Sequence, residues 1–522
     1  MLTDLHVRCA PVLETTTSRL TSAHFQTASK GEGRRAAEAP LSGAGGLGYA
    51  PRMSDTDALF DALRRSADPG VVRAVEDLVR DGRDEELARV NAVSFAAGRG
   101  LDEEKVIAAL LHASRLGLFE MSWNILCPSC GGVLGANATL KSVRQQDYHC
   151  AFCSLTSEPT LDDTVEVSFT VSPRLRRIAA HTPDNLGFWD YHRQVFFGSG
   201  VVFPEPDVFD ELSRKAVLEA VELQAGERMI LALQLPAQMV VVFDPVTHTA
   251  HVVETAGEPT PERRELSMIF TSASAGVGHT TLAPGPLRLL LDNRTGRRVL
   301  AGVYVLNQEM DRLLGGRRPF LTAKRLLSNQ TFRDLYRTET LDVEQRLKIM
   351  SLTFLFTDLK GSTDLYERVG DLVAYDLVRS HFQVLNEIVA SESGAVVKTI
   401  GDAVMATFPV PHHAVSAALR MRDSMRQLNA RRGAEELILK IGIHEGPCLA
   451  VNLNDRQDYF GQTVNIASRV QALATGDSIY ATQPVVQDAE AARLLAAQGV
   501  DAQPQALALR GVGDRVPVFA MT

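Results

Sequence analysis

Hydrophobic and polar positions follow two different periods along this chain. Between residues 53 and 122, apolar residues recur at helical spacing, as at Val72, Val75 and Val79, which predicts a bundle of helices. Between residues 161 and 310, short apolar runs are separated by Gly, Pro, Asn and Asp. That spacing predicts the strands and turns of a β-sandwich or barrel.

The C-terminal part of the chain mixes both periods. An apolar run at Leu352–Phe356 has the pattern of a buried strand, and helical and strand patterns alternate after it. This alternation predicts an α+β domain over residues 350–522. The elements expected after the first strand are a helix at Leu372–Ser391, a hairpin at Val396–Phe408, a helix at His413–Leu428, a strand at Leu437–Ile443 and a helix at Val464–Ala474.

A chain of 522 residues is too long for one hydrophobic core, so we expect several domains. Residues 1–52 show no sustained period and are expected to be a disordered extension, with Met53 as an alternative start. The charged helical pattern at 311–349 fits a signalling or dimer coil and a simple connector equally well. The predicted multidomain order is an extension at 1–52, a winged-helix-like helical domain at 53–122, a cysteine-rich ribbon at 123–160, a mostly-β regulatory domain at 161–310, a helical linker at 311–349 and the α+β domain at 350–522.

Charge and composition narrow the possible partners and compartment. The net charge is −9, and no cluster of Lys and Arg marks the second helix of the winged-helix-like segment, so a packing role is favoured there over nucleic-acid binding. No apolar run reaches the roughly 20 residues that span a bilayer. The N-terminus lacks the basic head and apolar core of a secretory signal. We therefore expect a cytoplasmic protein with no membrane span.

Four of the six cysteines form two Cys-x-x-Cys pairs. Cys127 and Cys130 make the first pair, Cys150 and Cys153 make the second, and Gly131–Gly132 supplies the open backbone of a knuckle turn. Two such knuckles complete a tetrahedral Cys₄ site, with the spacing of a zinc ribbon. Structural zinc is favoured over buried free thiols or a redox pair, because four cysteine ligands leave no coordination position open for catalysis.

Two carboxylates stand beside turns in the predicted α+β domain. Asp358 follows the first strand and Asp402 lies on the hairpin, and a pair of carboxylates that converges on phosphates suits Mg²⁺. Two such ions about 3.5–4 Å apart activate an attacking oxygen and stabilise a leaving one. The backbone of Lys360, Gly361 and Ser362 lies between the first strand and the next helix, where its N–H groups are placed to cradle a triphosphate.

Three segments together resemble the catalytic domain of class III nucleotide cyclases: Phe356–Thr363, Val397–Phe408 and Asp458–Arg469. They occur in the order expected of that family, and the resemblance covers about Leu352 to Phe519. It implies a ferredoxin-like α+β fold that works as a homodimer, here joined to an N-terminal regulatory region that contains the zinc ribbon.

The resemblance also implies roles for single residues. Each site would take its metal carboxylates from one chain and its base-reading and transition-state residues from the other, so that Lys398 and Asp402 of one chain serve opposite sites. The implied roles are metal binding (two Mg²⁺ or Mn²⁺ ions) for Asp358 and Asp402, purine reading for Lys398 and Asp458, contact with the ribose and α-phosphate in the transition state for Asn465 and Arg469, and contact with the triphosphate for Arg510.

The pair of Lys398 and Asp458 favours ATP as the substrate. Adenine offers an acceptor at N1 and a donor at N6, whereas guanine offers the reverse pattern and would leave buried polar groups mismatched at about 1–3 kcal/mol each. The expected reaction is in-line attack of the ribose 3′-oxygen on the α-phosphorus, which yields 3′,5′-cyclic AMP and pyrophosphate. Arg469 would meet the growing phosphoryl charge.

Some alternatives stay open at this point. The acceptor of the 3′-hydroxyl proton is Asp358, a metal-bound oxygen or water. The other two function classes are a guanylate cyclase, and a non-catalytic nucleotide-sensing dimer whose output runs through the N-terminal segments.

Overall fold

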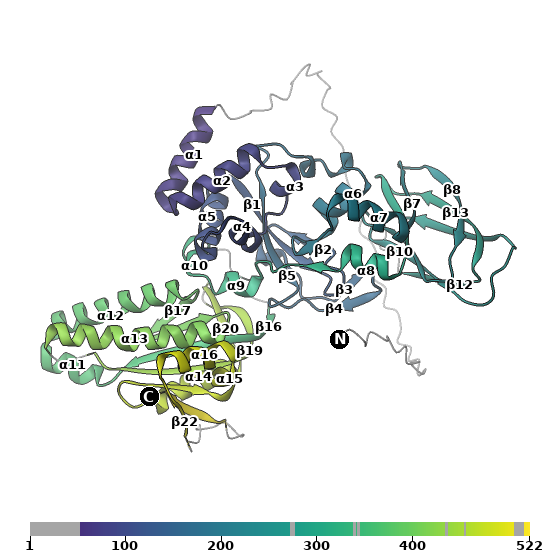
Figure 1. The fold of residues 1–522 in the computed structure, drawn as a ribbon. Helices are drawn as coiled ribbons and strands as arrows, with labels where there is room; N and C mark the ends of the chain where they lie inside the picture. Colours follow the sequence, from purple (N-terminus) through teal and green to yellow (C-terminus); the bar gives the residue numbers. More distant parts are fainter. Residues whose placement is uncertain are drawn as a thin grey trace, which may run out of the picture. The chain divides into compact units, whose positions relative to one another are not determined.

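The computed structural model describes residues 53–271, 277–337, 341, 345–433, 437–453, 456–505 and 516–521 (Figure 1). The extension expected at 1–52 and the site residue Arg510 lie outside these ranges. We refer to residues 53–337 as the N-terminal module and to residues 345–521 as the C-terminal domain. No helix in the described ranges is both long and apolar enough to cross a membrane.

Helices open the N-terminal module, as the apolar period predicts. Asp68, Asn91 and Asp102 begin the second, fourth and fifth of them by accepting backbone N–H groups of the first turn. The bounds are α1 (Met53–Ser66), α2 (Pro69–Asp81), α3 (Asp84–Leu87), α4 (Ala92–Arg99) and α5 (Glu103–Arg115).

These helices do not form a free-standing bundle. Their apolar faces share one core with an antiparallel sheet in the order β2-β1-β5, so the sheet completes the bundle. Two further short strands pair beside the second cysteine knuckle. The bounds are β1 (Phe119–Leu126), β2 (Val133–Asn137), β3 (Tyr148–Cys150), β4 (Leu155–Ser157) and β5 (Val165–Val171).

The predicted mostly-β segment is a sandwich and not a barrel. One sheet has the order β12-β10-β9-β14-β7, the other has the order β11-β13-β8, and both bury side chains in a common apolar core. The bounds are β7 (Val217–Leu223), β8 (Arg228–Leu235), β9 (Val240–Asp244), β10 (Thr249–Thr255), β11 (Arg264–Phe270), β12 (Gly278–Leu282), β13 (Gly285–Asn293) and β14 (Val299–Val305). Two helices that the strand pattern did not predict precede the sandwich, α6 (Phe188–Tyr191) and α7 (Pro206–Ala216), with β6 (Val201–Val202) between them.

The charged segment at 311–349, which was predicted to be a helical linker, consists of several short elements. Its described residues hold three short helices, α8 (Gln308–Leu314), α9 (Ala323–Leu327) and α10 (Gln330–Leu335), and the strand β15 (Gly316–Arg317), which pairs with β6. Gly315 and Gly316 end the first helix, and Leu326, Leu327 and Phe332 are buried in the module's core. A dimer coil needs those apolar residues on an exposed stripe, so the coil interpretation is wrong for this part.

A mixed sheet with helices forms the C-terminal domain, and the predicted strands, hairpin and helices are all present. The sheet order is β17-β18-β16-β19-β21-β23-β22, with β20 paired to β19. The strands are β16 (Leu347–Leu359), β17 (Ala395–Ile400), β18 (Ala403–Phe408), β19 (Leu439–Leu453), β20 (Arg456–Phe460), β21 (Ser478–Thr482), β22 (Ala502–Gln505) and β23 (Val518–Met521). The helices are α11 (Ser362–Val369), α12 (Asp371–Ser391), α13 (Pro411–Arg432), α14 (Gln462–Leu473), α15 (Gln483–Gln487) and α16 (Ala489–Gln498).

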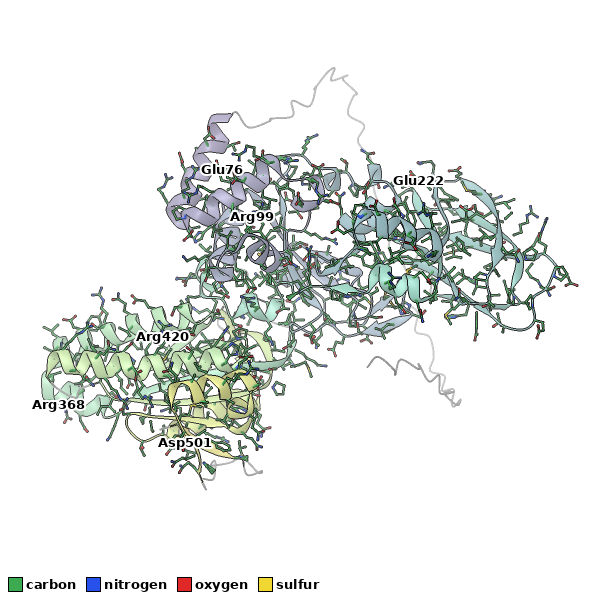
Figure 2. The ribbon with its side chains drawn as sticks, viewed as in Figure 1. Glu76, Arg99, Glu222, Arg368, Arg420 and Asp501 are labelled. Carbon is green, nitrogen blue, oxygen red and sulfur yellow. The ribbon has the colours of Figure 1, made fainter. Side chains whose placement is uncertain are left out.

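Both faces of β16 are buried between Leu352 and Thr357, which explains why apolar residues occur on both of its faces there. Leu355 and Leu359 pack into the core beneath α12 and α13, whereas Leu352, Phe354 and Phe356 join the core of the N-terminal module. The outer faces of the helices carry charge, and Arg368 and Arg420 lie there in Figure 2. The C-terminal domain and the N-terminal module therefore share a hydrophobic core through one face of the sheet.

We expect two buried histidines to make the fold acid-sensitive. Burial lowers the pKa of His192 and of His444 to about 4, whereas histidine in an unfolded chain titrates near about 6.5. As the pH falls below about 6.5, the unfolded chain takes up protons first, so the free energy of unfolding decreases until the pH reaches about 4. The total loss is on the order of 3 kcal/mol for each histidine.

Thermal unfolding followed by circular dichroism at pH 7.5 and pH 5.5 measures this effect, and we expect the lower Tm at pH 5.5. His444→Gln should flatten part of the pH dependence, because glutamine does not titrate and keeps a polar partner for Thr482, whose Oγ1 lies 2.7 Å from His444 Nδ1. Equal Tm values at the two pH values would contradict the burial argument.

Candidate active site

Asp402 lies at the turn of the predicted hairpin, beside the strand that carries Asp358. Gly401 has a φ of +64°, a left-handed conformation that favours glycine and allows the tight turn between β17 and β18. Asp402 follows it, and its Oδ2 accepts a hydrogen bond from the backbone N–H of Leu359 at 3.2 Å. Since Leu359 directly follows Asp358, the two aspartates lie at the same end of neighbouring strands. Carboxylate oxygens in this arrangement fit a hard divalent cation.

Lys440 is a charged neighbour of this pair that the sequence analysis did not name. It stands directly opposite Asp358 in the pairing of β19 with β16, and its ammonium forms an ion pair with the Asp358 carboxylate. Its position supplies a positive charge beside two acidic groups, which otherwise repel each other. Only the strand register brings the two residues together, so no local motif signals the contact.

Lys398 and Asp458 are in direct contact although they are 60 residues apart in the chain. Lys398 Nζ on β17 donates to Asp458 Oδ2 on β20 at 2.5 Å, and Asp458 Oδ1 accepts from the backbone N–H of Tyr459 at 2.8 Å. The side chain of Lys398 is 41% exposed and that of Asp458 is 10% exposed. A donor and an acceptor thus stand side by side with one end open to solvent. We call these two residues the base-reading pair, after the role that the sequence analysis predicts for them.

Asn465 and Arg469 lie one turn apart on α14, so their side chains share one face of the helix. Asn465 is exposed and Arg469 is half-buried. Neither side chain has a polar partner among the residues that the structure describes. The helix approaches β19 closely because Gly442 has no side chain: a Cβ at Gly442 would lie 2.1 Å from the backbone nitrogen of Gln471. Both side chains are therefore available for a bound molecule.

The phosphate-cradle segment is only partly arranged as predicted. Gly361 has a φ of +68° and begins α11, which leaves the first backbone N–H groups of that helix at the turn. The backbone N–H of Lys360 is not free for a phosphate, because it donates to the carbonyl oxygen of Ile438 at 2.9 Å. The Lys360 ammonium lies beside Gly476, where a Cβ would be 3.3 Å from Nζ, and the residue lines a groove of about 510 Å³ with Arg426.

The four paired cysteines converge on one point in the N-terminal module. Their Sγ atoms all lie within 4.8 Å of one another, and Cys130 Sγ is 3.7 Å from Cys150 Sγ. Sulfur atoms around a tetrahedral zinc, with Zn–S bonds of about 2.3 Å, stand about 3.8 Å apart, so the donor set fits that ion. Hydrogen bonds from Cys130, Cys150 and Cys153 hold the pKa of the Cys127 thiol far below its usual value. His149 bonds Thr156 instead and is not part of the cluster.

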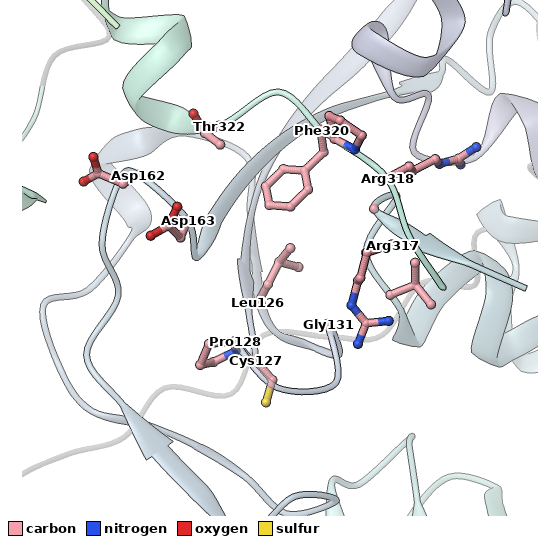
Figure 3. Close-up of a pocket in the computed structure, with 14 residues that line it drawn as sticks. Leu126, Cys127, Pro128, Gly131, Asp162, Asp163, Arg317, Arg318, Phe320 and Thr322 are labelled. Atoms are coloured by element: carbon pink, nitrogen blue, oxygen red, sulfur yellow. The ribbon is translucent and has the colours of Figure 1, made fainter. Parts of the chain in front are cut away.

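A pocket of about 480 Å³ lies beside the first cysteine knuckle (Figure 3). Leu126 and Phe320 point into it, and Asp163 stands at one side of its mouth. Arg317, on the opposite side, donates to the carbonyl oxygen of Ser129 at 2.9 Å and so ties β15 to the knuckle.

Asp162, which Figure 3 shows on the side away from Arg317, links this pocket to the C-terminal domain. Asp162 lines the pocket and accepts from the backbone N–H groups of Met350 at 2.6 Å and Ser351 at 3.3 Å. It also forms an ion pair with Lys324 on α9 at 3.1 Å. Met350 and Ser351 are the bulge of β16 on β19, so this carboxylate fixes the strand that leads to Asp358.

Comparison with known proteins gives two family matches. Residues 53–334 match a family of unknown function, DUF5939, and residues 345–501 match the family described as the adenylate and guanylate cyclase catalytic domain. The first match covers more than half of the chain and the second covers the C-terminal site described above.

Curated relatives include cyclases of both kinds. An adenylate cyclase of Mycosarcoma maydis is 33% identical in an alignment of 172 residues that covers 28% of this chain and 7% of that protein. Guanylate cyclase 32E of Drosophila melanogaster is 31% identical in an alignment of 140 residues that covers 24% of this chain and 12% of that protein. Among solved structures, the adenylyl cyclase CyaB from P. aeruginosa is 23% identical, with a TM-score of 0.30, over 34% of this chain and 96% of that one. The chain spans less than a third of the length of the curated relatives that it matches.

The two family matches correspond to the N-terminal module and the C-terminal domain of the structure. The family match at 345–501 contains every predicted site residue except Arg510 and the four cysteines, and those cysteines fall within the match at 53–334. The mixed sheet with covering helices is the fold of the C-terminal match, as the sequence predicted. The chain belongs to the family of unknown function DUF5939 and carries at its C-terminus a class III adenylate and guanylate cyclase catalytic domain.

Proposed function

We propose that this protein is an adenylate cyclase, which converts ATP to 3′,5′-cyclic AMP and pyrophosphate in a homodimer. The observation that carries the proposal is the contact of Lys398 with Asp458, because it combines one donor and one acceptor at a partly open position. Adenine presents N1 as an acceptor and N6 as a donor. Lys398 can therefore donate to N1 and Asp458 can accept from N6, in place of their bond to each other. Guanine presents the opposite pattern and leaves both groups mismatched.

Asp358 and Asp402 are proposed to hold two Mg²⁺ or Mn²⁺ ions. When bound, such ions polarise phosphate oxygens and neutralise their charge. The remaining roles in binding and charge stabilisation belong to residues of the chain itself. Lys440 balances the Asp358 carboxylate, Asn465 positions the ribose, and the Arg469 guanidinium meets the negative charge that grows on the α-phosphoryl group.

A second copy of the chain is needed for this chemistry in our proposal. The base-reading pair and the residues of α14 would face the carboxylates of the partner, so that the homodimer has two equivalent sites. We propose that Gly361 and Ser362 contribute backbone N–H groups to the triphosphate and that Arg510 contributes its side chain. Lys360 itself contributes no donor in this arrangement, because its backbone N–H donates to the carbonyl oxygen of Ile438 at 2.9 Å and its ammonium lies beside Gly476.

For the N-terminal module we propose a regulatory role with a structural zinc. Cys127, Cys130, Cys150 and Cys153 would all be ligands, which leaves no open position for catalysis. Reduced thiolates of this kind suit a cytoplasmic location. This module shares a hydrophobic core with the C-terminal domain. A structural change in one of them would therefore alter the packing of the other.

Purified protein given ATP or GTP with Mg²⁺ or Mn²⁺ tests the proposed reaction. Cyclic AMP and cyclic GMP are separated and quantified by chromatography. We expect a kcat/KM for ATP at least about tenfold above that for GTP, because two mismatched hydrogen bonds cost more than about 1.4 kcal/mol. Lys398→Glu combined with Asp458→Ser reverses the donor and acceptor pattern and should move the preference toward GTP.

Other results would select other functions. A preference of the unaltered protein for GTP would make it a guanylate cyclase. A folded dimer that forms no cyclic nucleotide under any of these metal conditions would favour a nucleotide-sensing dimer.

A further inference from the structure

One arginine of the N-terminal module holds both strands that carry the base-reading pair. Arg333, on α10, donates through Nη2 to the carbonyl oxygen of Val397 at 3.3 Å and to that of Gln457 at 3.0 Å. These two residues immediately precede Lys398 and Asp458. The guanidinium therefore bridges β17 and β20 at the positions where they present the pair.

The contact lies at a bulge that decides the direction of Lys398. The register of β17 on β18 shifts between Val396 and Lys398, so Val397 has no partner on β18. Backbone groups at a bulge lose their ladder hydrogen bonds and need other partners. Two side chains of α10 supply them: Gln330 Oε1 accepts from the N–H of Val396 at 2.8 Å, and Arg333 donates to Val397. Since strand side chains alternate between faces, losing the bulge would turn Lys398 to the other face of the sheet.

Helix α10 is itself fixed to the rest of the N-terminal module. Phe332 is buried, and its ring packs edge-on to Trp123 of β1 with 5.8 Å between ring centroids. Tyr336 stacks on Phe332 and donates its hydroxyl to the carbonyl oxygen of Leu111 of α5 at 3.1 Å. A displacement of α5 or β1 therefore carries α10, and with it Arg333, relative to the strands of the C-terminal domain.

We propose that Arg333 is a positioning residue through which the N-terminal module of one chain controls the base-reading pair of that same chain. The inference rests on the proposed function, in which that pair serves the site whose carboxylates come from the partner. Arg333 does not touch substrate in this proposal. It keeps the bulge in place, and a signal that shifts α10 changes base reading without touching Asp358 or Asp402.

Arg333→Met removes the donors and keeps the aliphatic stem. We expect kcat/KM for ATP to fall about 10²-fold, because a displacement of about 1 Å at a positioned group has effects of that size. The ratio of ATP to GTP use should fall as well, and Arg333→Lys, which keeps a cationic donor group but not the guanidinium geometry, should recover part of both. Gln330→Leu removes the other support of the bulge and should act in the same direction, which keeps the test available if Arg333→Met folds poorly.

Arg325→Met is the matched control. Arg325 lies on the preceding helix, α9, and its partners Glu103 and Glu104 both belong to the N-terminal module. Its loss removes a half-buried guanidinium from the same region without touching β17 or β20. We expect the ATP to GTP ratio to be unchanged.

Mixed dimers separate positioning from general damage. A chain with Lys398→Ala combined with a chain with Asp402→Ala leaves one intact site, whose base-reading pair comes from the Asp402→Ala chain. We expect Arg333→Met to lower the activity of the mixture about 10²-fold when it is placed in the Asp402→Ala chain, and less than about twofold when it is placed in the Lys398→Ala chain. Differently tagged chains allow the heterodimer to be isolated before the assay.

The outcomes are distinct. Equal losses from the two placements, or no loss from either, would overturn the assignment of Arg333 while leaving the shared site intact. An inactive mixture of Lys398→Ala and Asp402→Ala without any change at Arg333 would instead overturn the shared site, and the assignment of Arg333 falls with it. If Arg325→Met lowers the ATP to GTP ratio as much as Arg333→Met does, the effect comes from lost stability of the N-terminal module, and the assignment of Arg333 is wrong.

Discussion

Asp402→Ala is expected to abolish cyclic AMP formation and to leave the fold intact. The substitution removes a carboxylate from the pair that is proposed to hold the metal ions, and such ions supply several kcal/mol of charge stabilisation in the transition state. A loss of about 4 kcal/mol corresponds to about 10³-fold in rate. The substitution also removes the hydrogen bond from the N–H of Leu359, which contributes about 1 kcal/mol and shifts the Tm by about 2–4 °C.

The measurement combines cyclic AMP formation with thermal unfolding of the same preparation. Asp423→Ala is a suitable control, because Asp423 is an exposed aspartate on α13 that pairs only with neighbouring arginines of that helix among the described residues. It should keep full activity. Retention of more than about a tenth of the activity by Asp402→Ala would mean that Asp402 is not a required metal ligand.

Cys150→Ser is expected to release zinc and to destabilise the N-terminal module. The four cysteines come from two separate knuckles, so an ion that all of them bind joins two parts of the chain, and its binding free energy becomes folding free energy. Serine is a poor ligand for zinc and leaves a gap in the coordination shell. We expect about one zinc per chain in the unaltered protein by elemental analysis, and almost none in the variant.

Unfolding followed by hydrogen exchange locates the damage. Protection should be lost around β2, β3 and β4, while α12 and α13 of the C-terminal domain keep theirs. A chelator should reproduce the pattern in the unaltered protein. Cys448→Ser is the control, because Cys448 is a buried thiol of the C-terminal domain outside the cluster, and its loss should leave the zinc content unchanged. Absence of zinc from carefully reduced, unaltered protein would remove the metal from the proposal.

Local patterns were sufficient for most of the secondary structure. A helix is recognised by residues three and four positions apart, and a strand by residues two apart, so both are written into short windows of sequence. The hairpin around Gly401, the helix at Asp371–Ser391 and the two cysteine knuckles are of this kind. Local patterns were not sufficient for the segment at 311–349. Its apolar residues fit a helical period, but two glycines and burial in the module's core divide the segment into short helices.

The sequence by itself determined the types of elements, the convergence of four thiols and the set of residues that match a nucleotide cyclase domain. Only the tertiary structure decided which of these residues meet. The contact of Lys440 with Asp358 depends on the register of two strands that lie far apart in the chain. The hydrogen bonds from Arg333 to Val397 and Gln457 depend on the packing of α10 against a bulge. Such contacts involve no fixed sequence spacing, because they follow from how whole elements bury their apolar faces against each other.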